Sequence, residues 1–284
     1  MKRYLSLVKF SHTIFAMPFA MVGFFLAVWY HHYTFNLSLL ILVLLCMVFA
    51  RNAAMSFNRL ADHKIDRMNP RTVKREIPSG QVSLQSATLF VWINSMAFIV
   101  CTWFINSLCF YLSPVALLIV LAYSYTKRFT ALSHFVLGLG LALAPIGAYL
   151  SVSGQFHYLP MLFSITVLTW VAGFDIIYAM QDEDFDKEQN LHSIPVRLGG
   201  KNALKLSIFL HFISASTILL AGYLAGFGLI YWAACLIFII LLIYQHSLVR
   251  PDKLSKVNLA FFTTNGVASV LFAGLMIFDL WLQY

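Results

Sequence analysis

Residues 51–75 read RNAAMSFNRLADHKIDRMNPRTVKR, a stretch that begins in an apolar helix and ends in a basic loop. Asn58, Asp62 and Asp66 follow one another at intervals of four, so they lie on successive turns of one helical face. Carboxylates that face the same way repel each other unless a cation lies between them. Oxygen ligands suit a hard divalent cation such as Mg²⁺. The stretch therefore predicts a metal site at the end of a helix.

A second acidic stretch, DIIYAMQDEDFDKEQN at 175–190, repeats this spacing. Tyr178, Asp182 and Asp186 again stand four apart, and each follows its counterpart in the first stretch by 120 residues. A constant offset between two acidic helix ends indicates an internal duplication. We expect the number of helices between the two stretches to be the repeating unit.

The composition indicates an all-helical integral membrane protein. The 284 residues are 61% hydrophobic and 11% charged, which excludes an ordinary soluble domain. Apolar runs close to the roughly 20 residues that a helix needs to cross a bilayer mark the spans. No linker of biased composition divides the chain, so we expect one domain over 1–284. We predict nine transmembrane helices, at about 12–31, 37–62, 86–105, 107–124, 134–152, 159–180, 203–224, 227–247 and 258–282.

The distribution of positive charge predicts the orientation. All nineteen Lys and Arg residues fall in the N-terminal segment, in the loops after even-numbered spans, or on the adjoining helix ends. By the positive-inside rule, the N-terminus is cytoplasmic and the C-terminus lies outside. The net charge of +8 is therefore mostly topogenic and does not indicate a nucleic-acid partner. The four cysteines lie within spans and lack metal-ligand spacing, so we expect them to be core residues.

The two acidic stretches end the second and the sixth span, so their offset corresponds to one four-helix unit. Two such units, related by a pseudo-two-fold axis and followed by a ninth helix, would turn these two spans toward each other. Their carboxylates would then meet over a central cavity at the cytoplasmic side. A bundle built from two pseudo-repeated four-helix units is therefore the predicted fold.

Arg51 points along the same face as Asn58 but lies about 16 Å deeper than Asp62, at 1.5 Å per residue. An ionisable side chain at hydrocarbon depth is costly and usually faces a cavity or a partner. Two interpretations stay open: a structural arginine paired with a carbonyl or an acidic neighbour, or an anchor for an anionic substrate. Asp175, similarly deep on the sixth span, is either its partner or a further site residue.

Two basic segments lie near the carboxylates. The first, NPRTVKREIPSG at 69–80, carries Arg71, Lys74 and Arg75, which suit a polyanion such as diphosphate when they lie beside a metal held by carboxylates. The second follows the fourth span and consists of Lys127 and Arg128; it serves equally well as a topological signal. The histidines show no metal-binding spacing, and we expect interface positions for His12, His134 and His192.

The motifs Asn58-x-x-x-Asp62-x-x-x-Asp66 and Asp182-x-x-x-Asp186 resemble the paired aspartate motifs of the UbiA family of intramembrane prenyltransferases. One such motif is weak evidence, but two of them 120 residues apart in a polytopic chain are specific. The resemblance reaches from the first span past the sixth. It extends to the flanking segments KFSHTIFAMPFA at 9–20, RTVKREIPSG at 71–80, YSYTKRFT at 123–130, APIGAYLSVSG at 144–154 and YAMQDEDFDKEQNLHSIPVRLG at 178–199.

The first and second of these segments look most like 4-hydroxybenzoate polyprenyltransferases of ubiquinone synthesis. Near relatives prenylate other aromatic acids on routes to menaquinone, and this alternative stays open. The resemblance implies a helical bundle in the bacterial inner membrane, with an active site that opens to the cytoplasm. It also implies a polyprenyl diphosphate donor, an aromatic acid acceptor such as 4-hydroxybenzoate, and Mg²⁺ as the cofactor.

The resemblance further implies a role for individual residues. Arg51 matches a position that meets the carboxylate of the acceptor. The crowded second motif leaves open a pairing through Glu183 or Asp184 in place of the outer aspartates. The metal ligands and catalytic residues would be Asn58, Asp62, Asp66, Asp182 and Asp186. The contacts to the diphosphate would be Arg71, Arg75, Lys127 and Arg128, with Arg59 as a further candidate.

The expected chemistry is an electrophilic aromatic substitution. Metal and cations neutralise the leaving diphosphate, and an apolar, aromatic-rich cavity shields the carbocation-like prenyl group from water. Asp175 and Tyr178 are candidates for the residue that takes the ring proton. A transporter is the alternative from another class, because repeats and intramembrane charge suit it as well. However, coupling residues of transporters tend to lie near the midplane, whereas most acids here lie at one face.

Overall fold

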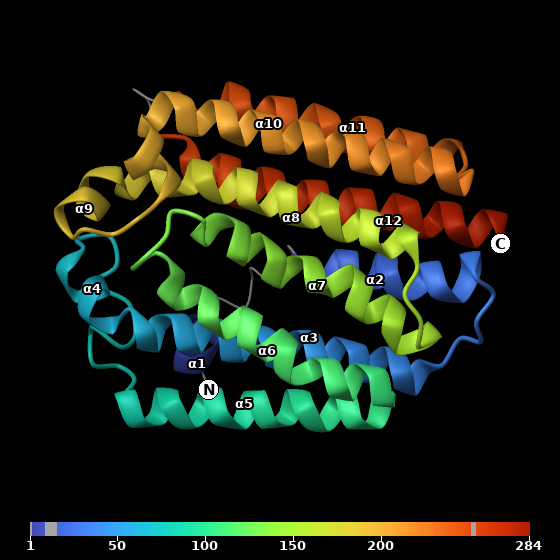
Figure 1. The fold of residues 1–284 in the computed structure, drawn as a ribbon, viewed down its shortest axis with the longest axis horizontal. Helices are drawn as coiled ribbons and strands as arrows, with labels where there is room; N and C mark the ends of the chain where they lie inside the picture. The colour runs from blue at the N-terminus through green and yellow to red at the C-terminus, as the bar shows by residue number, and fades with distance from the viewer. Residues whose placement is uncertain (1, 9–15, 251–253) are drawn as a thin grey trace.

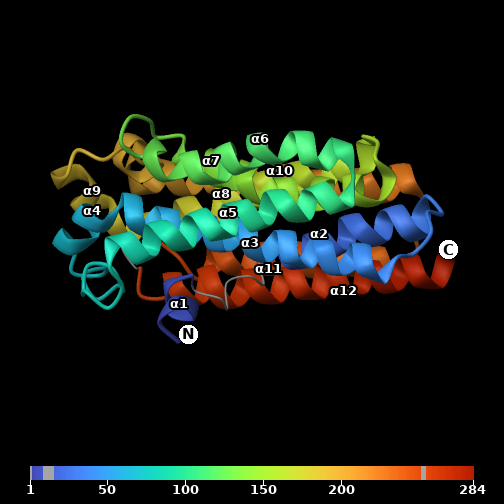
Figure 2. The same cartoon turned by 90° about the horizontal axis from the view of Figure 1, so that it is seen from below.

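The computed structural model describes residues 2–8, 16–250 and 254–284, and every secondary-structure element that these residues form is a helix. The long helices lie side by side along one axis, and the short α4 and α9 lie together at one end (Figures 1 and 2). The long helices are α3 (Leu37–Ala61), α5 (Leu84–Ile105), α6 (Ser107–Thr126), α7 (Ser133–Ser153), α8 (Tyr158–Ala179), α10 (Ile194–Ala225), α11 (Leu229–Ser247) and α12 (Asn265–Gln283). The shorter elements are α1 (Lys2–Leu7), α2 (Met17–Phe25), η2 (Leu26–Tyr30), α4 (His63–Met68), η3 (Met180–Asp182), α9 (Glu183–Glu188) and η4 (Leu259–Thr264).

Eight helices of the described chain are long and apolar enough to cross a membrane, and they correspond to the second to ninth predicted spans. The first predicted span is described only from residue 16 onward. There Met17–Tyr30 forms a shorter apolar helix. The multi-pass helical architecture is therefore confirmed, whereas the count of nine, the pseudo-repeat and the orientation stay predictions.

The seventh predicted span lies within a longer element. We expected the seventh span to begin at residue 203, but α10 begins at Ile194, where the Ser193 hydroxyl accepts a hydrogen bond from the Val196 amide. Gly199 has φ 73° and ψ 153°, a conformation open mainly to glycine, so the helix kinks there. Two helical segments thus meet at Gly199, and the predicted span at 203–224 lies in the second of them.

Polar residues at the ends of the spans fix where the helices begin and stop. The side chains of Asn36 and Asn106 accept hydrogen bonds from the backbone amides three residues later and so begin α3 and α6. Gly154 and Gly226 end α7 and α10 in the left-handed conformation that a helix C-terminus favours. Short connections of this kind keep neighbouring helices antiparallel.

The bundle is packed unevenly, and this positions the pockets. In α8, 61% of the membrane-spanning window is buried, and large side chains such as Trp170 and Phe174 join it to α2, α11 and α12 in the main core. The corresponding share is 17% in α3 and α6. Space is therefore left between α3, α5, α6 and α7, on the side away from the main core.

Candidate active site

Both acidic stretches reach one polar pocket at the end of the bundle that carries α4 and α9 (Figure 1). The pocket has a volume of about 230 Å³. Its walls come from α3, α4 and the loop that follows them, from the facing ends of α6 and α7, and from the end of α8 with η3 and α9. The predicted site residues that line it are Asn58, Asp62, Asp66, Arg71, Arg75, Lys127, Asp175, Tyr178, Asp182 and Asp186.

Asp62 lies where α3 ends, and its side chain is almost fully buried. The Nζ atom of Lys127 lies 2.5 Å from Asp62 Oδ2, and the Asn58 amide donates to the same oxygen over 3.4 Å. The loop beyond α6 is held in place because the His192 backbone amide donates to the carbonyl of Lys127 over 2.7 Å. The loop after α6 thus places the ammonium group of Lys127 beside the first acidic motif.

Asp66 is paired within its own segment. The NH1 atom of Arg75 donates to both carboxylate oxygens of Asp66, over 2.7 and 2.9 Å. The chain turns back because the Thr72 hydroxyl donates to the backbone carbonyl of Asp66, and because the Asn69 side chain accepts from the Arg71 amide. The polar residues of this loop therefore aim its arginines at the pocket.

Asp182 is bound by the same loop from the other half of the chain. Arg71 donates to both of its carboxylate oxygens, and its Nε atom lies 2.9 Å from Oδ1. The Asn69 amide donates to Oδ1 over 3.3 Å. Arg71 also donates to the Tyr178 hydroxyl over 2.8 Å and lies over its ring. These contacts hold the two acidic stretches together.

The second motif contributes its outer aspartates to the pocket. Asp182 and Asp186 line it, whereas Glu183 and Asp184 do not. Glu183 forms an ion pair with Lys187, with 2.7 Å between Glu183 Oε1 and Lys187 Nζ, and Asp184 is exposed. The short 3-10 turn η3 lies between α8 and α9, and the outer aspartates and the two inner acids point to different sides of this segment. The geometry thus favours the outer pair over ligands closer together in sequence.

Four predicted cations do not line the polar pocket, and one of them, Lys74, is exposed. Arg128 lies 3.6 Å from Asp62 and donates to the Ala61 carbonyl over 2.6 Å. Arg59 is 5% exposed and lies behind the pocket, near Asp66 and Glu76. Arg51 donates to the Val8 carbonyl over 3.3 Å, as one of its two predicted interpretations allowed, and lines a second pocket instead.

His134 is the polar residue that the sequence interpretation missed. We expected it at a membrane interface, but it is 3% exposed, and its Nδ1 atom lies 2.7 Å from Asp175 in the polar pocket. Of the two alternatives for Asp175, a partner of Arg51 or a further site residue, its place in the polar pocket beside His134 favours the second. His192, by contrast, is exposed, and His12 lies outside the described residues. The spacing of histidines could not reveal the pair, because its members lie on α7 and α8.

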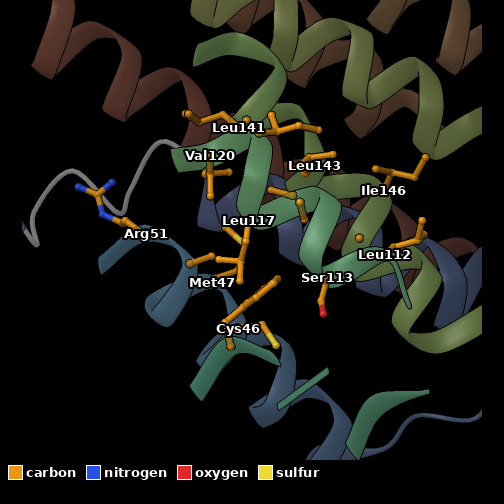
Figure 3. A pocket seen from close by; sticks show the side chains of 18 of the residues that line it. Cys46, Met47, Arg51, Leu112, Ser113, Leu117, Val120, Leu141, Leu143 and Ile146 are labelled. Carbon is orange, nitrogen blue, oxygen red and sulfur yellow. The ribbon is translucent and has the colours of Figure 1, made fainter. Parts of the chain in front are cut away.

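The second pocket is apolar and has a volume of about 420 Å³. It lies between α3, α5, α6 and α7, where Figure 3 shows Met47, Leu117, Leu141 and other aliphatic side chains around it, with Arg51 at the edge of the group. Tyr123 and Leu137 line both pockets, so the polar and the apolar space adjoin there. A long apolar chain with a polyanionic head fits this pair of pockets.

The polar pocket fits Mg²⁺ by its donor set. It offers five aspartate carboxylates and the Asn58 side chain, and the buried Asp62 Oδ1 accepts no hydrogen bond from the described residues. Within the described ranges, no three His, Cys, Asp or Glu side chains are close enough together to hold a metal ion by themselves. Mg²⁺ does not require such a group, because it is commonly bound by one or two carboxylates together with substrate phosphates and water.

Comparison with known proteins gives consistent results. Residues 16–267 match the model of the UbiA prenyltransferase family. The chain is 30% identical over 242 residues to the 4-hydroxybenzoate octaprenyltransferase of Tolumonas auensis, which covers 85% of this chain and 84% of that protein. It is also 30% identical over 236 residues to the protein of the same name from Aliivibrio fischeri, over 82% and 81% of the two chains.

Solved structures share the fold. The apo structure of a UbiA homolog from Aeropyrum pernix superposes with a TM-score of 0.86 at 32% identity, over 94% of this chain and 98% of that one. A UbiA homolog from Archaeoglobus fulgidus bound to GPP and Mg²⁺ superposes with a TM-score of 0.79 at 22% identity, over 98% and 99%. At that identity, the second likeness concerns the fold.

Proposed function

The chain belongs to the UbiA prenyltransferase family, and from this premise we propose that it transfers a polyprenyl group from a polyprenyl diphosphate to an aromatic acid. The proposed acceptor is 4-hydroxybenzoate, and the proposed pathway is quinone synthesis of the ubiquinone type. The observation that carries the proposal is the junction of the two pockets at Tyr123 and Leu137. At this junction a polyanionic head fits the polar pocket, and an apolar tail fits the adjoining apolar pocket.

The diphosphate occupies the polar pocket. Arg71, Arg75 and Lys127 line this pocket, and their side chains already meet carboxylates there. Phosphate oxygens attract the same guanidinium and ammonium groups, so the donor competes with the aspartates for them. Asp62, Asp66, Asp182 and Asp186, with help from Asn58, would hold Mg²⁺, which when bound would supply Lewis-acid neutralisation of the leaving diphosphate. Arg128 and Arg59 support these groups from outside the pocket.

The prenyl chain occupies the apolar pocket. Its walls are mostly aliphatic, with Tyr123 as the aromatic side chain at the junction. Walls of this kind exclude water from the allylic carbon once its bond to oxygen weakens, and the Tyr123 ring offers a π-face to the developing positive charge. The expected aromatic-rich lining is thus reduced to a few rings, and shielding is the main contribution of the pocket.

The acceptor ring lies between the two spaces, with its carboxylate on Arg51. This arginine lines the apolar pocket and is seven residues, or about 10 Å along α3, from Asn58. A charged side chain at that depth favours an anionic group in an otherwise apolar wall. The ring is then oriented with its carboxylate toward Arg51 and its reactive edge toward the allylic carbon. An acceptor on a menaquinone route would use the same contact.

The membrane arrangement belongs to the same proposal. The apolar runs predict nine spans, the basic loops predict a cytoplasmic N-terminus, and the family resemblance implies an active site that faces the cytoplasm of a bacterial cell, in its inner membrane. The pocket end of the bundle carries Arg71, Arg75 and Lys127, which agrees with the positive-inside rule. The alternative of a transporter is not supported, because the family is one of prenyltransferases.

Prenyl transfer by the purified protein tests the proposal. The assay contains detergent, Mg²⁺, geranyl diphosphate and 4-hydroxybenzoate, and compares the wild type with Asp62→Ala, Asp182→Ala and, as a matched control, Asp184→Ala. We expect a Mg²⁺-dependent prenylated acid that both pocket variants lose and the control retains. Product with a different aromatic acid alone would move the acceptor to a neighbouring branch. No transfer to any aromatic acid from folded protein would refute the proposal.

A further inference from the structure

His134 and Asp175 form a pair in the polar pocket, and the proposed binding of the diphosphate does not use this pair. His134 begins α7, and Asp175 lies in the last turns of α8, so the pair joins two neighbouring helices. The distance between His134 Nδ1 and the nearer Asp175 oxygen is 2.7 Å. The Asp175 side chain is 21% exposed, compared with 2% for Asp62 and 5% for Asp66. Its carboxylate is therefore accessible from the pocket.

The hydrogen bonds of His134 fix its tautomer. The Ile194 backbone amide lies 3.3 Å from His134 Nε2, and an amide N–H can only donate. Nε2 must therefore be the acceptor, and Nδ1 carries the proton that it donates to Asp175. The imidazole is neutral in this arrangement. Its hydrogen bond orients the Asp175 carboxylate, and no full positive charge stands beside that carboxylate.

This sets Asp175 apart from the other carboxylates that line the pocket and form ion pairs. Asp62, Asp66 and Asp182 each face a lysine or an arginine, whose charge is permanent. A carboxylate that is held by a neutral hydrogen-bond donor remains available to accept a proton. Asp186, which is held by a hydrogen bond to Ser193, belongs to the set assigned to Mg²⁺. Of the remaining acids in the pocket, Asp175 is thus the one arranged for proton transfer.

The pair also lies at the right depth. Leu137, one turn beyond His134 on α7, lines both the polar and the apolar pocket. Asp175 precedes Asp182 by seven residues, which places it about 10 Å further along the bundle axis than the second acidic motif. The allylic carbon of a donor with its diphosphate among the aspartates would lie at this level. So would the ring that attacks it.

We propose that Asp175 is the catalytic residue that accepts the ring proton and that His134 is its positioning residue, an inference that rests on the proposed function. The ring carbon ortho to the hydroxyl forms the new bond to the allylic carbon with a pair of ring electrons. The allylic C–O bond breaks, and its electron pair leaves with the diphosphate. The proton on the attacked ring carbon moves to an Asp175 oxygen, and the C–H electron pair restores the aromatic ring.

Tyr178, the other candidate for this step, is arranged differently. Its hydroxyl accepts a hydrogen bond from Arg71, and its ring packs 4.2 Å from that of Phe261. A hydroxyl that already accepts from a guanidinium has one lone pair fewer for a proton and lies beside a permanent positive charge. Tyr178 therefore serves to hold Arg71 rather than to take the proton.

Hydrogen isotope effects test the proposal on the full-length enzyme. Transfer is measured with 4-hydroxybenzoate that carries hydrogen or deuterium at the two carbons ortho to the hydroxyl. We expect no isotope effect in the wild type, where C–O cleavage limits the rate. In Asp175→Asn, transfer falls by roughly 100-fold or more, the scale of general base catalysis, and an isotope effect appears because proton loss becomes limiting. Binding of geranyl diphosphate with Mg²⁺ stays at the wild-type level, which shows that the variant is folded.

Variants of His134 separate positioning from mere structural support. His134→Ala should show a smaller loss of transfer with an isotope effect, and His134→Asn, which keeps a donor near the Nδ1 position, should recover part of the rate. His192→Ala, which removes an exposed imidazole next to this segment, is the matched control. Full activity in Asp175→Asn, or a lower rate without an isotope effect, would overturn the inference. A wild type that prenylates no aromatic acid would refute the proposed function instead.

Discussion

Arg71 and Asp182 form a bidentate ion pair between residues that lie 111 positions apart in the sequence. The arginine comes from the loop after the first acidic motif, and the aspartate opens the second. Their contact brings the basic loop over the polar pocket, and the Tyr178 hydroxyl holds the far side of the guanidinium over 2.8 Å. The proposed recognition of the donor and the closure of this end of the bundle therefore involve the same side chain.

Replacement of Arg71 should weaken donor binding. Arg71→Ala removes a planar fork that can meet two phosphate oxygens at once, and we expect KM for geranyl diphosphate to rise roughly 10- to 100-fold, as for one or two charge-assisted hydrogen bonds. Arg71→Lys should recover only part of this, because an ammonium group is a point charge. Steady-state kinetics with varied donor provide the measurement. An unchanged KM in Arg71→Ala would remove this residue from the diphosphate site.

Lys127 and Arg128 are neighbours in sequence, but we expect unequal effects from their loss. Lys127 lines the pocket at 2.5 Å from Asp62, whereas Arg128 lies 3.6 Å from it and donates to a backbone carbonyl. Lys127→Ala should raise KM for the donor by about tenfold or more, and Arg128→Ala by clearly less. Kinetics of the two variants under identical Mg²⁺ and salt check this order. Equal effects, or the reverse order, would contradict the geometry.

The apolar pocket should set the length of the prenyl chain. A Cβ added at Gly147 meets no atom within 4 Å, and this residue lines the pocket, so Gly147→Phe adds a ring to the wall without a clash at the backbone. We expect the variant to keep transfer from geranyl diphosphate and to lose it from long polyprenyl diphosphates. Gly274→Phe on the exposed side of α12 is the control, with equally open space. The same chain-length profile in both variants would refute this role of the pocket.

Arg51 should affect the acceptor and not the donor. It lines the apolar pocket, outside the polar one, so Arg51→Ala removes the proposed partner of the carboxylate while the diphosphate contacts remain. KM for 4-hydroxybenzoate should rise by roughly 10- to 100-fold, with KM for geranyl diphosphate unchanged. Arg51→Lys should be intermediate. A rise of the donor KM alone would move Arg51 from the acceptor to the prenyl chain.

Close packing between α2 and α7 should make the bundle sensitive to a single methyl group. A Cβ at Gly23 would lie 2.0 Å from the Pro145 carbonyl oxygen, so Gly23→Ala forces the two backbones apart. Overpacking of this kind costs about 1–3 kcal/mol, and the temperature of thermal unfolding in detergent should fall. Gly274→Ala, where a Cβ has open space, should leave it unchanged or raise it. Equal unfolding temperatures for both variants and the wild type would contradict the contact.

Much of the fold could be predicted from the sequence because a membrane simplifies the problem. Each apolar run must form its own backbone hydrogen bonds, so hydropathy alone marks the helices, and α3 and α5 end within a residue of their predicted bounds. The spacing of Asp62 with Asp66 and of Asp182 with Asp186 also predicts which carboxylates share a helical face, and all four line one pocket. Periodicity decides which way residues of one helix point.

The remaining features depend on contacts between helices, which periodicity does not contain. His134 meets Asp175 because α7 packs on α8, and no spacing within either helix announces the pair. The kink at Gly199 reflects a backbone conformation that a glycine permits but does not require. The apolar pocket forms because four helices leave a space between them. Its size follows from packing, which the order of side chains along one helix does not determine.

The two adjoining pockets also determine how the products separate. In the proposed reaction, transfer divides a single amphiphile at the level of Tyr123 and Leu137, where the polar and the apolar space meet. The charged fragment is then soluble in water and stands among cations at the end of the bundle, whereas the alkylated ring is a lipid among aliphatic walls. Each product is thus formed next to the medium that takes it up, which is water for the diphosphate and lipid for the alkylated ring. Release of one product does not require passage through the pocket of the other.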